Sequence, residues 1–445
     1  MPEQDDRLTR LTVTEAATAI RNGSITSEKL AAACLSRISE RDSGIKAFTH
    51  LIPGLVMEEA KAADRTRANG HAMGPLHGVP IAIKDVIDTA GYLNENGCPV
   101  YSGHQPDRDA PCVAALRSAG AIILGKTVTT ELALLTPSPT RNPVDTRRSP
   151  GGSSAGSAAA VADFMAPAAL GTQTAGSVIR PASYCGVYGY KPTFGLIPRS
   201  GVLVQSPTLD TVGLFARSID DIALLTGCMS VHDGTDPTSY HCSGSGIVRI
   251  AGEEPPETPR FAFVKTPAWA QADPAMQTAF IHLGESLGEH CDELEIPALT
   301  EVLEWQRLVQ LAENAGYYGP LQDRARELLS PGLNARLDEG AKVPVRAYVE
   351  ALAGREPAYE RIAKLMGGYS AILTPAAPGP APRLEEGITG SPIFNGLWTY
   401  LGMPAISLPV LELDGLPVGV QLVGLRRDDG RLLRTARWLA ARFAR

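Results

Sequence analysis

Short apolar segments bounded by glycine and proline recur along the chain and alternate with segments of helical periodicity. Uninterrupted apolar runs of this length are typical of strands buried on both faces of a sheet. The predicted strands are 79–85, 121–126, 261–265, 371–377, 405–410 and 418–424. The predicted helices are 111–120, 156–166, 218–229, 276–290, 300–318 and 430–443. This alternation predicts an α/β fold with one large mixed, mostly parallel β-sheet covered by helices on both faces.

Helical patterns also precede the first predicted strand. Thr12 and Glu15 have the spacing of a capping box, in which two side chains satisfy the first backbone N–H groups of a helix. Farther along, Leu30, Cys34 and Ile38 recur every four residues, which is typical of one buried helix face. The chain therefore begins with helices that lie against the sheet.

We interpret the chain as one domain, with a surface excursion at 231–260. That segment is rich in glycine, serine, proline and charge, and it directly precedes a predicted strand. A second independent domain after it is the alternative. The predicted parts are N-terminal helices at 1–70, a core at 71–230, the excursion, and a C-terminal part at 261–445 that completes the sheet.

Composition and charge exclude several classes of protein. The 445 residues carry a net charge of −7 spread along the chain, so neither nucleic acid nor a membrane surface is an expected partner. The acidic start, MPEQDDRLTR, does not have the pattern of a secretory signal. The seven cysteines are scattered without CxxC pairs, which argues against disulfides and zinc. We expect a cytoplasmic protein that uses no metal or other cofactor.

Two common motifs match the sequence in an unsuitable context. Gly120–Thr127, GAIILGKT, has the spacing of a phosphate-binding loop, but its four intervening residues are themselves a predicted strand and a helix precedes it. Gly152–Gly156, GSSAG, has the spacing of a nucleophile elbow around Ser154, but turn formers and charges stand where a buried strand is required. A nucleotide-binding protein therefore remains only as an alternative.

A lysine and two serines lie in segments suited to a catalytic site. Lys84 ends a predicted strand, and ligands bind at the carboxyl ends of strands in open α/β sheets. Ser153 and Ser177 lie in two glycine-rich loops that flank an alanine-rich helix. The chain has no histidine between His104 and His232, so the usual base for a serine nucleophile is not supplied locally.

These segments resemble the amidase signature family of Ser-Ser-Lys hydrolases. The segments that carry the resemblance are GVPIAIKD, AGAIILGKTVTTELA, GGSSAGSAAAVA, GTQTAGSVIRPASYCGVYGYKPTFG, LGMPAISLPV and LPVGVQLVG, which together span about residues 25–425. Within that family, the sequence of residues 171–186 is most similar to the malonamidase type. The resemblance implies the amidase signature fold and an enzyme that hydrolyses C–N bonds of linear amides.

Carried over by residue, the resemblance assigns a catalytic triad. It makes Ser177 the nucleophile, Ser153 the bridging serine after a cis peptide bond, and Lys84 the ultimate base. The N–H groups of Thr174, Ala175, Gly176 and Ser177 would form the oxyanion hole. Lysine ordinarily has a pKa of about 10.4, so Lys84 must lie in a low-dielectric site to accept a proton near neutral pH.

The substrate stays open between two interpretations. Arg180 stands one position later than the arginine of many family members, which argues against an A-type glutamine amidotransferase subunit. The shifted position suits a clamp for a substrate carboxylate, and the alternative is an arginine that ties down the loop. Leu135, Phe394 and Trp398 predict a partly apolar pocket for aryl amides or carbamates (urethanes), with esters as further substrates. A homodimer is also left open.

Overall fold

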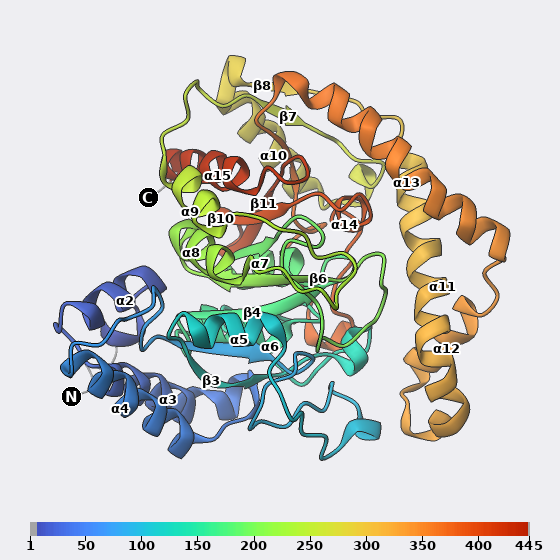
Figure 1. Cartoon of the computed structure of the whole chain (residues 1–445). Coiled ribbons are helices and arrows are strands. Elements are labelled where there is room, and N and C mark those ends of the chain that lie inside the picture. The colour runs from blue at the N-terminus through green and yellow to red at the C-terminus, as the bar shows by residue number, and fades with distance from the viewer. Residues whose placement is uncertain (1–6, 444–445) are drawn as a thin grey trace.

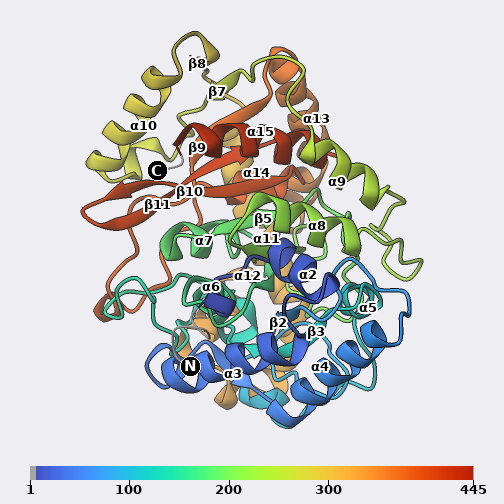
Figure 2. The same ribbon diagram turned by 90° about the vertical axis from the view of Figure 1, so that its left-hand side faces the viewer.

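One continuous β-sheet forms the centre of the molecule, with helices on both of its faces (Figures 1 and 2). The computed structural model describes residues 7–443. Within them the sheet has eleven strands in the order β1-β3-β2-β4-β6-β5-β10-β11-β9-β7-β8. The strands are β1 Phe48–His50, β2 Pro80–Lys84, β3 Ile122–Thr127, β4 Ala168–Gln173, β5 Tyr188–Lys191, β6 Thr211–Ala216, β7 Phe261–Phe263, β8 Cys291–Glu293, β9 Ala371–Pro375, β10 Ala405–Leu413 and β11 Leu416–Val423.

The predicted single mixed sheet is confirmed, but its parallel share is smaller than predicted. Six of the ten strand pairings in the described chain are antiparallel and four are parallel. The difference arises because β5 and β6, which the apolar pattern did not reveal, join β4 to β10 in antiparallel order. Both strands contain glycine and polar residues, which weakens the apolar signal of a buried strand.

The helices cover the sheet and also extend beyond it. Figure 1 shows α11, α12 and α13 along one side of the molecule, away from the N-terminal helices. Between residues 7 and 443 the α-helices are α2 Val13–Arg21, α3 Ser27–Ile45, α4 Pro53–Ala68, α5 Pro111–Ser118, α6 Ala155–Ala162, α7 Ile179–Cys185, α8 Ile219–Met229, α9 Gly244–Gly252, α10 Pro274–Leu287, α11 Leu299–Ala325, α12 Pro331–Gly340, α13 Val345–Leu365, α14 Gly396–Tyr400 and α15 Asp429–Phe443. In this part of the chain, no helix is both long and apolar enough to cross a membrane.

The N-terminal predictions are confirmed in detail. The Thr12 hydroxyl accepts the N–H of Glu15 and the Glu15 carboxylate accepts the N–H of Thr12, so both halves of the capping box are present. Leu30, Cys34 and Ile38 are buried on one face of α3. Helix α3 packs against β2 and α4 packs against β3, whereas α2 packs against α8 (Figure 1).

Segment 231–260 contains a helix that its composition did not predict. Helix α9 packs against α8 and α15 through Ile247 and Ala251, which are buried. Strands from both sides of this segment belong to the same sheet. The segment thus contributes to the layer of helices that covers the sheet.

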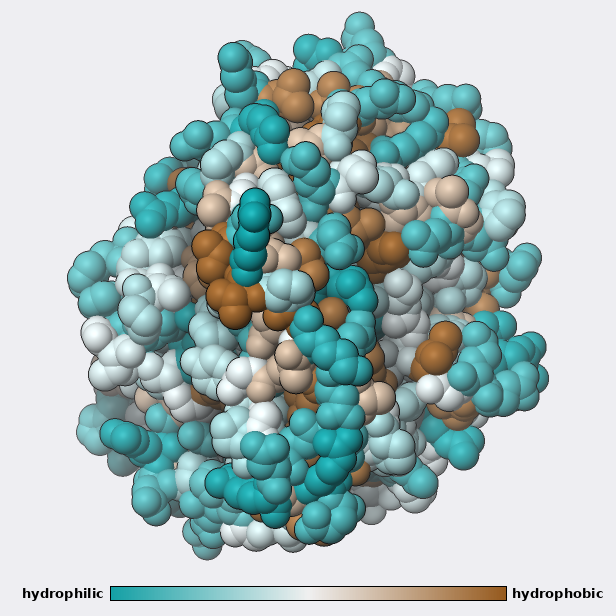
Figure 3. All heavy atoms as spheres, turned by 90° about the vertical axis from the view of Figure 1, so that its right-hand side faces the viewer, coloured by the Kyte–Doolittle hydropathy of each residue, from teal (hydrophilic) through white to brown (hydrophobic). Residues whose placement is uncertain are grey.

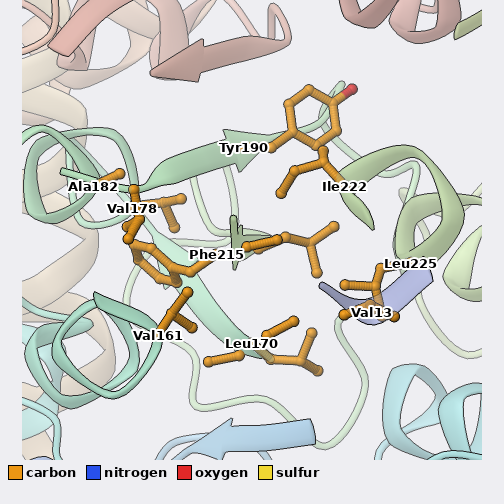
Figure 4. Packing of buried hydrophobic residues seen from close by; sticks show 14 of the residues in the cluster. Val13, Val161, Leu170, Val178, Ala182, Tyr190, Phe215, Ile222 and Leu225 are labelled. Atoms are coloured by element: carbon orange, nitrogen blue, oxygen red, sulfur yellow. The ribbon is translucent and has the colours of Figure 1, made fainter. Parts of the chain in front are cut away.

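The packed core fixes the ends of the elements that carry the candidate serines. Figure 4 shows Phe215 of β6 between Val161 of α6 and Val178 at the start of α7, with Leu170 of β4 close by. All four side chains are fully buried. A well-packed core resists displacement, so the loops before α6 and after β4 are held in place at the sheet edge where β2 ends.

Candidate active site

Lys84 is buried at the end of β2 and bonds to two hydroxyl groups. Its Nζ donates to Ser153 Oγ at 2.7 Å and to Thr172 Oγ1 at 2.8 Å. No part of Lys84 is exposed to solvent. Burial lowers the pKa of Lys84 well below its ordinary value, and the negative charge of Asp210 partly opposes this. A lysine in this setting can lose its proton and act as a base.

Ser153 lies beside Lys84 because of the loop that begins helix α6. The peptide bond between Gly152 and Ser153 is cis, as the family resemblance implied. The carbonyl oxygen of Ser153 accepts the N–H of Thr130 at 3.2 Å, and the serine is almost fully buried. Its hydroxyl therefore has few positions available other than the one facing Lys84.

Ser177 follows β4 in a loop whose backbone donors are free. The N–H groups of Ala175, Gly176 and Ser177 make no hydrogen bond with any residue that the structure describes. Ala175 does not have a positive φ, so its backbone is unstrained. A side chain at Gly176 would approach within 2.4 Å of Asn395 Oδ1, so only glycine fits there. Ser177 itself is half-buried.

Gln173 anchors the loop of Ser177 through side-chain hydrogen bonds, a role that the sequence did not reveal. Its Oε1 accepts the N–H groups of Val178 at 2.8 Å and Ile179 at 3.0 Å. Its Nε2 donates to Thr399 Oγ1, and that hydroxyl lies 2.8 Å from the carbonyl oxygen of Ala175. The neutral amide thus accepts two backbone N–H groups and donates to a hydroxyl oxygen, whereas a carboxylate at this position would have no N–H to donate.

Asp210 is a second residue that sequence reasoning missed. Its Oδ1 accepts the Thr174 hydroxyl at 2.6 Å, and its Oδ2 accepts the N–H groups of Gln205 and Ser206 at 2.8 Å. Burial raises the pKa of Asp210 to about 6. Asp210 thus ties the loop of Ser177 to the next segment of the site. A single aspartate in a turn carries no sequence signal for this role.

A cavity of about 400 Å³ opens at Ser177. Leu135 and Arg180 line it, as predicted. Helices α11 and α12 supply much of its wall. The lining residues are Ala133, Leu134, Leu135, Ala175, Gly176, Ser177, Arg180, Gln205, Leu303, Glu304, Gln306, Arg307, Gln310, Arg336, Ser391, Pro392 and Ile393.

Phe394 and Trp398 do not line this cavity, contrary to the prediction. Both are fully buried: Phe394 packs with Ala268 and Ala272, and Trp398 belongs to the core cluster that also contains residues of α11 and α13. Large aromatic side chains gain more from complete burial than from lining a wet cavity. Their neighbours Pro392 and Ile393 line it instead.

Arg180 connects the two serine loops through backbone carbonyls. Its Nη2 donates to the carbonyl oxygen of Gly152 at 2.5 Å, and its Nη1 donates to that of Gly390 at 2.5 Å. Its Nε is enclosed and has no partner among the described residues. Burial lowers the pKa of Arg180 to about 10. Both terminal nitrogens therefore hold loops, and one of these loops directly precedes Ser153.

The two misleading motifs have structural roles. Lys126 of GAIILGKT is fully buried within β3, where its Nζ donates to the carbonyl oxygen of Ile87 at 2.5 Å and to Asn94 Oδ1 at 3.1 Å. It is therefore not available to a phosphate. Ser154 of GSSAG is fully buried, and its Oγ both accepts the N–H of Thr172 and donates to the carbonyl oxygen of Thr172, each at 3.2 Å.

Replacement of Ser154 by alanine is expected to weaken the fold without removing the reactive serine. The lost hydroxyl leaves a buried N–H of Thr172 unpaired, so we expect the free energy of unfolding to fall by about 1–2 kcal/mol. Urea denaturation measures this loss, and labelling with a serine-directed phosphonate should still occur. Complete loss of labelling in a folded Ser154→Ala protein would contradict the structural role.

The arrangement can support acyl transfer. It places a buried amine beside one hydroxyl, a second hydroxyl on a cavity wall, and free N–H groups next to that second hydroxyl. In residues 7–443, no group of three or more histidine, cysteine, aspartate or glutamate side chains is placed to hold a metal ion.

Comparisons with known proteins agree on one family. The sequence model of the Amidase family matches residues 29–433. The chain is 32% identical to the A-type subunit of glutamyl-tRNA(Gln) amidotransferase from Chloroflexus aggregans, over 95% of this chain and 94% of that protein. A solved structure described as a vestigial protein complex that reveals the origins of an s-triazine catabolic enzyme is 28% identical, with a TM-score of 0.92 over 98% of this chain and 99% of the other.

Peptide amidase of Stenotrophomonas maltophilia is similar over the whole fold as well. It is 27% identical, with a TM-score of 0.85 over 98% of this chain and 97% of that enzyme. The predicted fold is therefore shared with an amidase over nearly the whole chain. With the family match extending over most of its length, the chain belongs to the Amidase family and is an amidase-signature hydrolase that acts on C–N bonds.

Proposed function

We propose that this enzyme hydrolyses small non-peptide amides, including aryl amides and carbamates, through an acyl-enzyme on Ser177. The observation that carries the proposal is the buried Lys84–Ser153 hydrogen bond, next to a cavity in which Ser177 and free N–H groups meet. A cavity of about 400 Å³ is in the range of small-molecule sites. Leu134, Leu303 and Ile393 give it an apolar wall for an aryl or alkyl group.

The first half of the reaction forms the acyl-enzyme. Neutral Lys84 takes the proton of Ser153 while Ser153 takes the proton of Ser177, and Ser177 Oγ attacks the carbonyl carbon. The N–H groups of residues 174–177 hold the resulting oxyanion, and each donor contributes about 3–4 kcal/mol to lowering the barrier. The intermediate collapses as the C–N bond breaks, and the amine leaves with the proton returned through Ser153.

The second half releases the acid. Water attacks the ester at Ser177 while the same relay accepts its proton, and the oxyanion forms again in the same place. Collapse breaks the bond to Ser177 Oγ, and the proton returns to that oxygen. For a carbamate, the acid formed is a carbonate monoester, which loses carbon dioxide in water and leaves the alcohol. The net reaction consumes one water and regenerates the neutral lysine.

A second candidate substrate is a malonamate-like acid clamped by Arg180. In its favour, Arg180 lines the cavity, forms no ion pair with a described carboxylate and has an unpartnered Nε. Against it, both terminal nitrogens already donate to backbone carbonyls. The hydrogen bonds to Gly152 and Gly390 therefore favour the loop-holding role.

A third candidate is a glutamine-hydrolysing enzyme that works only with a protein partner. The likeness to the A-type amidotransferase protein over nearly the whole length of both chains supports it, and a partner protein is part of this alternative. The position of Arg180, one residue later than the arginine of many family members, argues against it. Glutamine belongs in the substrate panel for this reason.

Substitution of Arg180 separates the first two candidates. If Arg180 holds loops, Arg180→Ala should lower kcat/KM for neutral aryl amides, aryl carbamates and malonamate by a similar factor, about 10-fold or more, because the position of Ser153 is disturbed. A clamp would instead give a selective loss of about 100-fold for malonamate alone. Steady-state kinetics on the purified variant measures both.

The same panel tests the proposal as a whole. We expect the wild-type chain, purified alone, to turn over neutral amides or carbamates faster than glutamine or malonamate. Hydrolysis of glutamine only, or activity only after a partner protein is added, would replace the proposal with the partner-dependent alternative. Selective hydrolysis of malonamate would replace it with the clamp.

A further inference from the structure

Asp210 is a buried carboxylate near Lys84 that the proposed reaction does not use. It directly precedes β6, which pairs with β4 in antiparallel order. The Thr174 hydroxyl donates to Asp210 Oδ1 at 2.6 Å. Two positions earlier in the chain, the Thr172 hydroxyl accepts from Lys84 Nζ at 2.8 Å. One threonine hydroxyl therefore contacts the lysine, and the next one along the chain contacts the carboxylate.

A small cavity joins this carboxylate to the surroundings of the lysine. Thr172, Thr174 and Asp210 all line it, and its volume of about 10 Å³ has room for about one water molecule. Apolar side chains complete part of its wall, namely Val202, Leu203 and Val212. Asp210 and the hydroxyl bonded to Lys84 thus face one nearly dry space, in which a charge acts more strongly than it does in water.

The surroundings of Asp210 support its ionised form. Besides the Thr174 hydroxyl, the N–H groups of Gln205 and Ser206 donate to the carboxylate, each at 2.8 Å. Burial raises the pKa of Asp210 to about 6, while these bonds and the positive charge of Arg199 oppose the shift. The side chain is therefore negatively charged at neutral pH.

This charge and burial act on Lys84 in opposite directions. Burial lowers the pKa of Lys84, and the negative charge of Asp210 raises it. A general base works best when its pKa lies near the operating pH, because a lysine with a much lower pKa is too weak to take a proton from Ser153. An anion at Asp210 therefore keeps the buried amine basic enough to serve the relay.

The other ionisable groups packed around Asp210 are engaged or neutral. Arg199 pairs with Asp236 at 3.3 Å. Glu313 of α11 accepts hydroxyl groups from three residues, which are Ser206, Thr208 and Tyr348. Tyr318 of α11 stays protonated, since burial raises its pKa well above the ordinary value. None of these groups takes the place of the Asp210 charge beside Lys84.

The charges nearer to Lys84 and on the helices outside it do not replace Asp210 either. Asp85 follows Lys84 in the chain, but its Oδ1 lies 4.0 Å from the buried Nζ of Lys126. Figure 3 looks onto the outer face of α11–α13, where hydrophilic and hydrophobic side chains are intermixed. Water and salt screen charges on such a surface. Among the described residues, Asp210 is thus the charge that acts on Lys84.

We propose that Asp210 is a positioning residue for the base: its negative charge sets the pH range in which Lys84 accepts a proton. The inference rests on the proposed function, since it concerns the lysine that the reaction uses. It also differs from the loop-holding role described above. Holding the Ser177 loop requires only the hydrogen bonds of Asp210, whereas setting the pH range requires its charge.

Asp210→Asn separates the charge from the hydrogen bonds. The amide has the same size, and its oxygen can accept the two N–H groups while its NH₂ donates to Thr174. We measure the rate at which a fluorophosphonate labels Ser177 as a function of pH, because this reagent has no titrating group of its own. The acid limb should shift by about 0.5–1 pH unit to lower pH, since Lys84 loses its proton more readily without the anion. The maximal rate should fall by only about 3-fold.

Two further variants make the result specific to the charge at this position. Asp210→Glu keeps the charge, so its acid limb should stay near that of wild type. Asp221→Asn is the matched control: Asp221 is also buried and accepts the N–H and hydroxyl of Thr14 at 2.8 and 3.0 Å, but it lies on α8 and lines neither cavity. Its limb should coincide with that of wild type. Thermal unfolding confirms that each variant is folded.

Three results would overturn the assignment: an unchanged limb in Asp210→Asn, a shift to higher pH, or an equal shift in Asp221→Asn. If Asp210 only holds the loop, Asp210→Asn should slow labelling by the same factor at every pH and leave the midpoint of the limb where it is. That outcome would keep the hydrogen bonds to Thr174 as the whole role of the residue.

A measurement without catalysis separates this inference from the proposed function. If Ser177 is not labelled, or if labelling has no acid limb, the proposed reaction fails. The titration of Lys84 is then followed by NMR of protein that carries ¹³C at lysine Cε, with the signal identified by its loss in Lys84→Met. A midpoint about 0.5–1 pH unit lower in Asp210→Asn than in wild type supports the role of Asp210. Equal midpoints, or a Lys84 that does not titrate, refute it.

Discussion

Replacing Ser177 with alanine is expected to lower kcat by on the order of 10⁴-fold or more and to abolish labelling by a serine-directed phosphonate. The change removes one hydroxyl from a half-buried loop position on the cavity wall, so the fold should survive. Without that oxygen no acyl-enzyme forms, and only the free N–H groups and the binding cavity remain to assist attack by water. Intact-mass spectrometry of phosphonate-treated protein measures the labelling.

Ser154→Ala provides the matched control for this experiment. It removes a hydroxyl 23 positions earlier in the chain, from a serine that is fully buried and bonded to Thr172. Peptide mapping of labelled wild type should locate the modification at Ser177. A modification mapped to Ser154, or undiminished labelling of Ser177→Ala, would show that another residue is the nucleophile.

The sequence predicted the mixed sheet, although not all of its strands, and it offered Lys84, Ser153 and Ser177 as a candidate triad. The family resemblance assigned Lys84, Ser153 and Ser177, because a lysine at the end of an apolar run and serines in glycine-rich loops do not identify a triad by themselves. The structure brings Lys84 and Ser153 to 2.7 Å and places Ser177 on the cavity wall. The catalytic roles of the three residues remain predictions, and the Ser177→Ala and Lys84→Met variants test two of them.

The sequence missed the strands β1, β4, β5, β6 and β8, and the reason is clearest for β5 and β6. Apolar runs identified β2, β3 and β9 because these strands are buried on both faces. Strands β5 and β6 are buried as well, but glycines in them replace apolar side chains where other groups approach the backbone. A side chain at Gly213 would lie 2.7 Å from the carbonyl oxygen of Tyr190, for example. Close packing of this kind cannot be seen from a periodic pattern.

The cavity wall was the part least accessible to prediction. Phe394 and Trp398 were chosen for their size, yet size favours burial, and smaller neighbours line the cavity instead. The α11 and α12 residues Gln306, Gln310 and Arg336 reach the cavity only because the two helices fold back over the site. Contacts between segments more than 100 residues apart in the chain leave no local signal.

Gln173 and Asp210 show why the site needs more residues than its triad. Gln173 holds the start of α7 through two backbone N–H groups, and Asp210 holds Thr174 and the segment at 205–206. Together with Arg180 they fix the Ser177 loop on three sides. Catalytic groups must stay within a fraction of an ångström of their productive positions. This requirement explains why several buried polar residues form hydrogen bonds that fix this loop.

Replacement of Lys84 by methionine is expected to lower kcat by about 10³-fold and to remove the acid limb of the pH–rate profile. Only the neutral amine accepts a proton, so activity is present above the folded-state pKa of Lys84 and is lost as pH falls below it. Because burial depresses that pKa well below its ordinary value, this limb should lie well below the pH at which free lysine titrates. The measurement is kcat/KM against pH for wild type and variant.

Lys126→Met is the matched control for this change. Lys126 is also buried, and burial lowers its pKa to about 8, but it bonds to the carbonyl oxygen of Ile87 and to Asn94 and lies outside the cavity lining. A folded Lys126→Met protein should keep phosphonate labelling and the acid limb. Loss of the acid limb in Lys126→Met, or a kcat of Lys84→Met within about 10-fold of the wild-type value, would show that Lys84 is not the base.

The same substitution has a predicted effect on stability. Between the depressed folded pKa of Lys84 and its unfolded value near 10.5, the unfolded chain binds more protons, so this lysine makes the free energy of unfolding rise with pH. Its destabilising effect is complete below the folded pKa and disappears above the unfolded one. Lys84→Met should therefore gain stability relative to wild type as pH falls, seen by urea denaturation at about pH 9 and about pH 6. A gain that is the same at both pH values would mean that Lys84 does not titrate within this range, and the lysine would then be held for its hydrogen bonds to Ser153 and Thr172 alone.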